Sequence, residues 1–174
     1  MKVLVSIVFV FFMACSDKSD TQDKPKYFAI KKYFQEEANR LSTTNPTVSK
    51  TVAQNNISQQ KNIKIDDWLS ELELFLASDI NKPAWRDSYK TISSLSKVEY
   101  IAKDKNLRTR KIIILYDLKG KPKQISIYNN TKNTLYNSEE KLYYYPDSAY
   151  TVQQQQNVLV MGKNSYIISG KIQN

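Results

Sequence analysis

Histidine is absent from the 174 residues of the chain, and this absence removes much of the chemistry that side chains can perform. Without imidazole there is no Ser-His-Asp triad, no histidine metal ligand and no histidine general base. The three glycines, Gly120, Gly162 and Gly170, are too scattered to form a loop that cradles phosphate. The groups that remain for catalysis are carboxylates, a serine with a lysine, and tyrosines.

Carboxylates occur as neighbours at Glu36–Glu37, Asp66–Asp67 and Glu139–Glu140. Sequence neighbours do not face each other on a helix or a strand, whereas a glycosidase needs two carboxylates about 5 to 9.5 Å apart across a cleft. We interpret the three pairs as a solvated helix face, a helix cap and a polar strand edge. The stretch Ser93–Lys97 is typical of a loop that opens a strand. The sequence therefore predicts no enzyme, no cofactor and no metal, with a carboxylate-dependent glycan hydrolase as the remaining enzymatic alternative.

The single cysteine, Cys15, follows an apolar run from Val3 to Met13. The run is shorter than the roughly 20 residues that span a bilayer, but it suits the apolar region of a signal peptide, with Lys2 before it and the small Ala14 at the cut. The stretch "FMAC", residues 12–15, resembles the lipobox of bacterial lipoproteins. The resemblance implies a signal peptide over residues 1–14 and a palmitate-type lipid anchor on Cys15, which would preclude thiol chemistry. An ordinary signal peptide with a free cysteine is the alternative, although a lone cysteine lacks a disulfide partner.

Residues 15–24 contain the cysteine and a polar tether, "SDKSDTQDK". As a flexible coil it would reach roughly 15 to 18 Å. Asp17 and Asp20 resemble the surface-export signals of Bacteroidetes-type lipoproteins, and a plain soluble spacer is the alternative. These features predict an outer membrane lipoprotein, periplasmic or surface-facing, with one globular domain over residues 25–174.

The net charge is +9, and the loss of Lys2 with the signal peptide leaves +8. A basic chain can bind nucleic acid, but the export signal points away from the cytoplasm and only four of the 26 basic residues are arginines. We therefore expect no nucleic-acid partner. A solvated basic surface or loose attraction to anionic lipid headgroups accounts for the charge.

Apolar periodicity predicts two amphipathic helices near the N-terminus of the domain. Tyr27, Ile30, Phe34, Ala38 and Leu41 fall on one face of a helix over residues 26–41. A hairpin follows, with strands near 48–52 and 57–65 and a turn at 54–56. A second helix, capped by Asp66 or Asp67, runs to Ala77 with an apolar face formed by Trp68, Leu69, Leu72, Phe75 and Leu76.

From residue 84 onward the pattern predicts strands joined by short connections, which favours an antiparallel meander. The expected strands are 84–93, 97–103, 109–117, 121–129, 133–145, 148–156, 158–161 and 165–172. Turns are expected at 117–120, 129–131, 146–148 and 162–164. The predicted fold class is α+β, with the two helices packed on a curved, mostly antiparallel sheet that can curl into a partial barrel.

The densest stretch is "DINKPAWRDSY", residues 79–89, which joins the second helix to the sheet. If it is a strand, Trp85, Asp87 and Tyr89 share one face, and Arg86 lies on the other. We interpret it as a structural corner, with a recognition patch as the alternative. Together with "LYYYPDS", residues 142–148, it resembles a family of Bacteroidetes lipoproteins with no known activity. That resemblance implies a compartment and a coherent fold, not a mechanism.

Tyrosines gather at Tyr143, Tyr144, Tyr145 and Tyr150. Half-buried strand tyrosine is the plain interpretation, and an interface to a partner is the functional one. We predict a membrane-anchored envelope lipoprotein whose non-enzymatic domain binds a protein partner or has a structural role. The alternative is a carrier or sensor that holds an apolar molecule or lipid in a cup between sheet and helices. Candidate lining residues, which would equally make an ordinary core, are Val98, Tyr100, Ile112, Ile114, Ile125, Ile127 and Ile167.

Overall fold

The structure is a computed structural model that describes residues 24–55, 57–159 and 162–173. The predicted signal peptide, Cys15 and most of the tether lie outside the described residues. Lipidation at Cys15 therefore stays a prediction.

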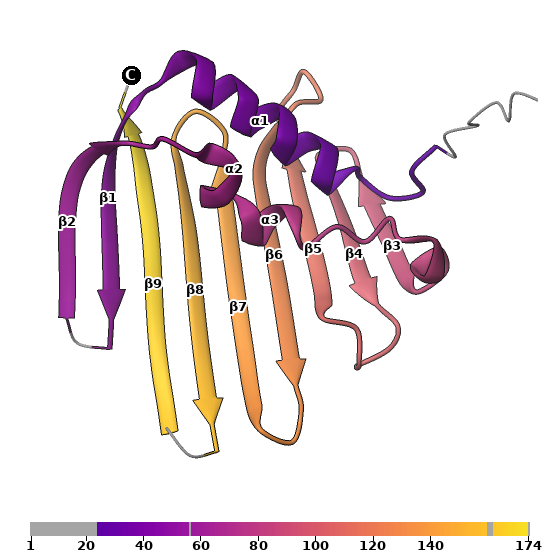
Figure 1. Ribbon diagram of the computed structural model, residues 1–174. Coiled ribbons are helices and arrows are strands. Elements are labelled where there is room, and N and C mark those ends of the chain that lie inside the picture. The colour runs from indigo at the N-terminus through magenta and orange to yellow at the C-terminus, as the bar shows by residue number, and fades with distance from the viewer. Residues whose placement is uncertain (1–23, 56, 160–161, 174) are drawn as a thin grey trace, which may run out of the picture.

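The described part of the chain forms one nine-stranded antiparallel sheet that does not close (Figure 1). The strands are β1 (Thr47–Gln54), β2 (Ile57–Lys64), β3 (Tyr89–Ser94), β4 (Lys97–Ala102), β5 (Thr109–Tyr116), β6 (Pro122–Lys132), β7 (Tyr136–Tyr145), β8 (Ala149–Val158) and β9 (Gly162–Gln173). Their spatial order is β2-β1-β9-β8-β7-β6-β5-β4-β3. The predicted antiparallel sheet is confirmed. The edge strands β2 and β3 lie at opposite ends, so the sheet remains open.

Strands β3 to β9 form the predicted meander, in which each strand pairs with the next along the chain. The hairpin β1–β2, also predicted, joins the far side of the sheet through antiparallel pairing of β1 with β9. Between β2 and β3 the chain must cross from one edge to the other. Residues 65–88 make this crossing over one face, and they contain the short helices α2 (Trp68–Glu71) and α3 (Glu73–Leu76) (Figure 1).

Several predicted boundaries are wrong for local reasons. The strand expected over 84–93 begins only at Tyr89, because Pro83–Trp85 form a 3-10 helix, η1. Residues 129–131 lie inside β6, and the turn comes later, where Asn133 Oδ1 accepts the N–H groups of Leu135 and Tyr136. Residues 162–164, expected as a turn, belong to β9, and β8 ends at Val158. The strand expected over 158–161 includes residues 160–161, which lie outside the described residues, so it stays a prediction.

The first helix, α1 (Ile30–Thr44), begins later than predicted. The N–H of Tyr27 donates to Asn81 Oδ1 at 3.0 Å, and that of Phe28 donates to the hydroxyl of Tyr100 at 3.0 Å, so this stretch is held to other elements before the helix starts. The helix ends at Thr44, and the C-cap residue Asn45 has a left-handed backbone (φ 44°) while its N–H donates to Leu41 O.

The second predicted helix is two single turns. Asp67 caps α2, as predicted, by accepting the N–H of Ser70 at 3.0 Å. The backbone leaves helical geometry at Leu72 (φ −98°, ψ 10°), and α3 follows. The helical pattern of Trp68, Leu72 and Phe75 is preserved, since all three side chains are buried.

The two faces of the sheet differ because successive side chains on a strand point to opposite sides. On the helix-side face, Phe34 of α1 lies 5.1 Å from the ring of Tyr144 and 4.8 Å from that of Phe75. This face supplies the sheet's share of the core: Val48, Tyr89, Val98, Tyr100, Ile112, Ile114, Ile125, Ile127, Leu142, Tyr144, Tyr150, Val152 and Ile172. Over the opposite side of the sheet, called the open face below, Figure 1 shows no helix formed by the described residues.

Candidate functional site

The predicted corner at residues 79–89 forms hydrogen bonds with the N-terminal segment of the domain. Asn81 accepts the N–H of Tyr27 and donates to Phe28 O, both at 3.0 Å. The hydroxyl of Tyr27 donates to Arg86 O at 2.7 Å. These bonds connect the start of the domain to the corner.

The four candidate residues of this corner separate in space. Trp85, Asp87 and Tyr89 do not share a strand face, because the strand starts only at Tyr89. Asp87 is exposed and pairs with Lys26 at 2.5 Å, so the lysine holds the pKa of its carboxyl below the ordinary value. Tyr89 is buried, its hydroxyl donates to Thr109 O at 2.9 Å, and burial raises its pKa to about 12. Lys82 lies 4.4 Å from the ring centroid of Trp85.

A small basic pocket adjoins this corner, where the described chain begins. It has a volume of about 180 Å³, and Lys24, Lys26, Lys82 and Arg86 contribute to its lining. Its position at the root of the predicted tether would bring positive charge near a membrane, where anionic headgroups attract lysine.

The four candidate tyrosines divide between the two faces. Tyr144 and Tyr150 are completely buried on the helix-side face and offer no surface to a partner. Tyr143 and Tyr145 point to the open face, half-buried and 38% exposed respectively. Of the proposed carrier lining, six residues are buried in the core, whereas Ile167 is 40% exposed on the open face.

Both buried tyrosines bind helix carboxylates. The hydroxyl of Tyr144 donates to Glu37 Oε2 on α1 at 2.5 Å, and that of Tyr150 donates to Glu71 Oε1 on α2 at 2.6 Å. Each carboxylate also meets a cation, Arg40 at 2.9 Å and Lys50 at 2.6 Å. Burial and the neighbouring carboxylate raise the pKa of both tyrosines, so each remains a hydrogen-bond donor across the physiological range.

The Glu37 carboxyl should make the stability of the protein depend on pH, and this can be tested. Burial raises the pKa of its carboxyl, but the hydrogen bonds from Arg40 and Tyr144 outweigh burial, and the folded pKa is below the ordinary 4.5. A carboxyl with a lowered folded pKa stabilises the protein above the unfolded pKa, and this stability is lost as pH falls through the folded pKa. We expect Glu37→Gln to lower the free energy of unfolding by about 1.5–3 kcal/mol at pH 7. At pH 3 the deficit should be smaller, as measured by urea unfolding at both pH values.

Its neighbour Glu36 is the matched control. The Glu36 side chain is 65% exposed, and its contact with Lys32 is 3.9 Å long. Glu36→Gln should change the free energy of unfolding by less than about 0.5 kcal/mol at either pH. Equal pH profiles for the two variants would contradict the role given to Glu37.

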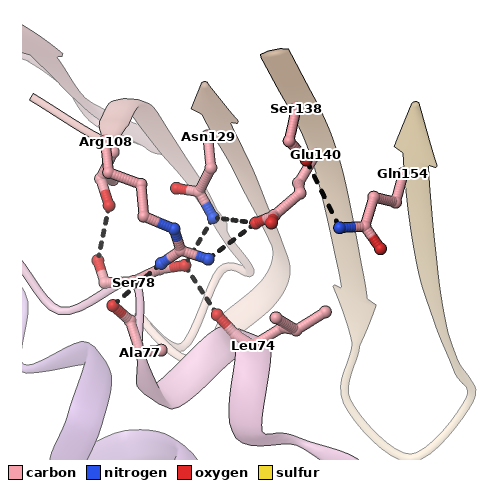
Figure 2. A network of polar contacts seen from close by, with 9 residues as sticks. Leu74, Ala77, Ser78, Arg108, Asn129, Ser138, Glu140 and Gln154 are labelled. Carbon is pink, nitrogen blue, oxygen red and sulfur yellow. Dashed lines mark hydrogen bonds and ion pairs between the residues drawn. The ribbon is translucent and has the colours of Figure 1, made fainter. Parts of the chain in front are cut away.

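The buried polar network in Figure 2 lies where α3 ends above the sheet. Arg108 donates to Glu140 Oε2 at 2.7 Å and to Ala77 O at 3.2 Å. Asn129 Nδ2 donates to the same Glu140 oxygen at 3.1 Å and to Ser78 Oγ at 2.9 Å. The network binds the end of α3 to β6 and β7, so we assign it a structural role.

The predicted acid pairs do not face each other across a cleft. Asp67 caps α2, as described, and Glu36 and Glu37 diverge on α1. Glu139 points to the open face, whereas Glu140 points to the helix-side face. Among the described residues no group of three or more potential ligands could hold a metal ion, and no helix is long and apolar enough to cross a membrane.

The open face carries a row in which lysines alternate with apolar side chains. Strand register places Lys90, Ile101, Lys111, Tyr128 and Lys141 directly opposite one another across β3 to β7. Lys111 lies 5.2 Å from the ring centroid of Tyr128, within cation–π range. A second row places Ile113 and Tyr143 beside the first; the rings of Tyr143 and Tyr128 are 6.3 Å apart. We call these seven residues the lysine–tyrosine patch.

The patch is basic in a basic surrounding. Glu99 is the acid nearest its centre, where it contacts Lys97 at 2.8 Å and Lys111 at 3.7 Å. The hydrogen bond from Lys97 is the main cause that lowers the pKa of Glu99. Further lysines on the open face are Lys132, Lys163 and Lys171, and the described strands β3 to β9 add only Glu139 as a second acid there.

Sequence reasoning identified Tyr143 but missed the rest of the patch. Lys111, Tyr128 and Lys141 are 13 or more positions apart, and only strand register brings them into one row. Alternation within each strand was the available signal, but it does not state which residues lie opposite.

No protein-family model, no curated protein and no solved structure matches this chain. The resemblance to Bacteroidetes lipoproteins therefore stays a prediction from residues 12–15, 79–89 and 142–148.

Proposed function

We propose that this chain is a membrane-anchored envelope lipoprotein whose folded domain, without catalysis, binds an acidic protein partner through the lysine–tyrosine patch. The observation that carries the proposal is the row of Lys90, Ile101, Lys111, Tyr128 and Lys141 on the sheet face that the described helices leave open. Half-buried aromatic and aliphatic side chains between cations suit an interface, since tyrosine contributes apolar area and a polar tip. The lysines would select a negatively charged surface and accelerate its association.

The packing of the helices supports this proposal, because they would hold the sheet rigid from the face opposite the patch. In this view α1 and the α2–α3 pair are the two amphipathic helices packed on the sheet, held by the Tyr144–Glu37 and Tyr150–Glu71 contacts. Because these helices occupy one face, a partner would bind the other. The fixed geometry of the sheet would limit the conformational entropy lost on binding.

Anchoring is tested by Cys15→Ser. Since the lipid would be attached to the thiol, this variant should lose palmitate labelling and leave the membrane fraction. Persistent labelling would show that the lipobox interpretation is wrong. The variant leaves the patch unchanged, so it separates anchoring from partner binding.

Partner binding is tested by site-specific photo-crosslinking in the native membranes. A photoreactive residue in place of Tyr143 should capture one acidic protein, whereas one in place of Leu69, which is 48% exposed on α2, should not. Lys111→Glu with Lys141→Glu should lower the crosslink yield at position 143 at least tenfold. Lys171→Glu, a single charge reversal on β9 of the same face, is the control for surface charge and should leave the yield unchanged. Equal yields from positions 143 and 69 would overturn the proposal.

A further inference from the structure

The far halves of β7, β8 and β9 contain polar side chains on both faces. These strands have 10, 10 and 12 residues, and in Figure 1 their lower ends extend well past α3. The tract Gln153–Gln156 of β8 alternates between the faces without one buried side chain. A polar extension of this kind buries little apolar area, so the hydrophobic effect gives it little stability. Because both faces of this extension carry polar side chains, burial also specifies the strand register there only weakly.

A pocket of about 460 Å³ lies on this extension. Two rows of side chains on the open face contribute to its lining. Glu139 of β7 stands opposite Gln155 of β8, and Asn137 stands opposite Asn157, which in turn faces Lys163 of β9. Directly opposite residues have Cβ atoms about 4.5–5.5 Å apart, so the rows form a regular lattice of polar groups.

The turn between β1 and β2 contributes Asn55 to the same pocket. Asn55 Oδ1 accepts the N–H of Ser165 at 3.1 Å, and its own N–H donates to Ser165 O at 2.8 Å. Its left-handed backbone (φ 52°) is a conformation that asparagine tolerates. These bonds fix the turn against β9, so this side of the pocket is held in place.

The lining is chemically distinctive. In the described part of the chain, the side chains of Glu139, Gln155, Asn157 and Lys163 make no hydrogen bond or ion pair within the protein. Each amide offers both donors and an acceptor, and the single carboxylate and single ammonium add opposite charges. A site for phosphate or another strong anion would contain several cations, and a site for an apolar ligand would have apolar walls. This lining has neither feature.

From this arrangement we propose that the pocket binds an uncharged, hydroxyl-rich ligand, namely a neutral oligosaccharide. Sugar hydroxyls both donate and accept, as the amides do, and a chain of sugars can lie along the two rows. No residue of the lysine–tyrosine patch lines the pocket, although Glu139 and Lys141 are neighbours on the same face of β7. The pocket therefore adds glycan contact to the proposed anchoring and protein binding without depending on either.

The test uses the full chain, produced with its own signal and purified in a zwitterionic detergent that has no sugar headgroup. Neutral hexasaccharides of glucose, xylose and N-acetylglucosamine are added, and saturation-transfer NMR detects which of them binds. Gln155→Ala with Asn157→Ala should weaken the binding of the preferred sugar at least tenfold. Gln153→Ala, on the same strand and face but outside the pocket, should leave it within twofold.

The outcomes are decisive. Binding that is lost in the double variant and kept in Gln153→Ala supports the site, provided that the thermal unfolding midpoints of the variants agree. If none of the hexasaccharides binds, or if both variants bind equally, the inference is wrong. If the otherwise unchanged protein captured no acidic partner at position 143, that result would count against the proposed function and not against this site.

Discussion

Replacing Arg108 with methionine should lower the free energy of unfolding by about 3 kcal/mol in urea titration. The side chain of Glu140 is only 9% exposed, and in this variant it would retain Asn129 Nδ2 as a donor but lose the guanidinium. Ala77 O at the end of α3 would also lose a donor. Removing one partner of a buried pair costs about 3–5 kcal/mol. We expect the lower end because Arg108 is 31% exposed, so water can reach the remaining carboxylate.

Arg110 is the matched control for this prediction. It lies two positions along the chain, and among the described residues its guanidinium donates to the backbone carbonyls of Asp104 and Leu107, at 3.2 and 3.5 Å, and to no side chain. Arg110→Met should cost less than about 1 kcal/mol. Adding Glu140→Leu to Arg108→Met should restore part of the lost stability, because no uncompensated buried charge then remains. Equal costs for the two arginine variants would refute the structural role of the network.

Gly170→Val should destabilise the protein by about 1–3 kcal/mol or more. Gly170 lies directly opposite Tyr150 in the β8–β9 ladder, and a Cβ built on Gly170 would stand 2.3 Å from the Tyr150 ring. The ring cannot easily move, because its hydroxyl binds Glu71 and its centroid lies 6.2 Å from that of Trp68. The glycine is required for close approach, not for an unusual backbone angle. Thermal or urea unfolding measures the loss.

Ser169→Val provides the control on the adjacent residue. Ser169 points to the open face, and valine suits a strand, so this change should be neutral or slightly stabilising. Tyr150→Val should itself be destabilising, since it removes the bond to Glu71. In the Gly170→Val background its added cost should be smaller by about 0.5–3 kcal/mol, because the steric conflict is gone. Additive costs would show that Gly170 and Tyr150 do not conflict as the geometry requires.

The N-terminal apolar faces and the C-terminal strands were predictable because their patterns are local. Ile30, Phe34, Ala38 and Leu41 recur with the helical period and are buried together. The turn at Pro146–Ser148 was also predictable, since Asp147 tolerates its positive φ of 58°. By contrast, the start of α1 was misplaced because distant groups, Asn81 and Tyr100, bind the backbone of Tyr27 and Phe28.

The candidate sites illustrate the same limit. The corner at residues 79–89 was recognisable by composition, but the 3-10 helix at Pro83–Trp85 separated the side chains that an extended strand would have aligned. Tyr144 and Tyr150 were indistinguishable in sequence from Tyr143 and Tyr145, because strand parity alone does not state which side the helices cover. The buried carboxylate partners, Glu37 and Glu71, are more than 75 positions from their tyrosines.

By itself, the sequence determined that the domain combines amphipathic helices with an antiparallel meander, because those signals depend on neighbours a few residues apart. Only the tertiary structure decided the strand order, in which residues 65–88 cross the sheet and β9 pairs with β1. It also decided which face stays open, and so brought Lys111, Tyr128 and Lys141 into one row and Asn137, Asn157 and Lys163 into another. Such rows depend on long-range pairing, which is set by burial of the whole helix-side face and not by any local stretch of the chain.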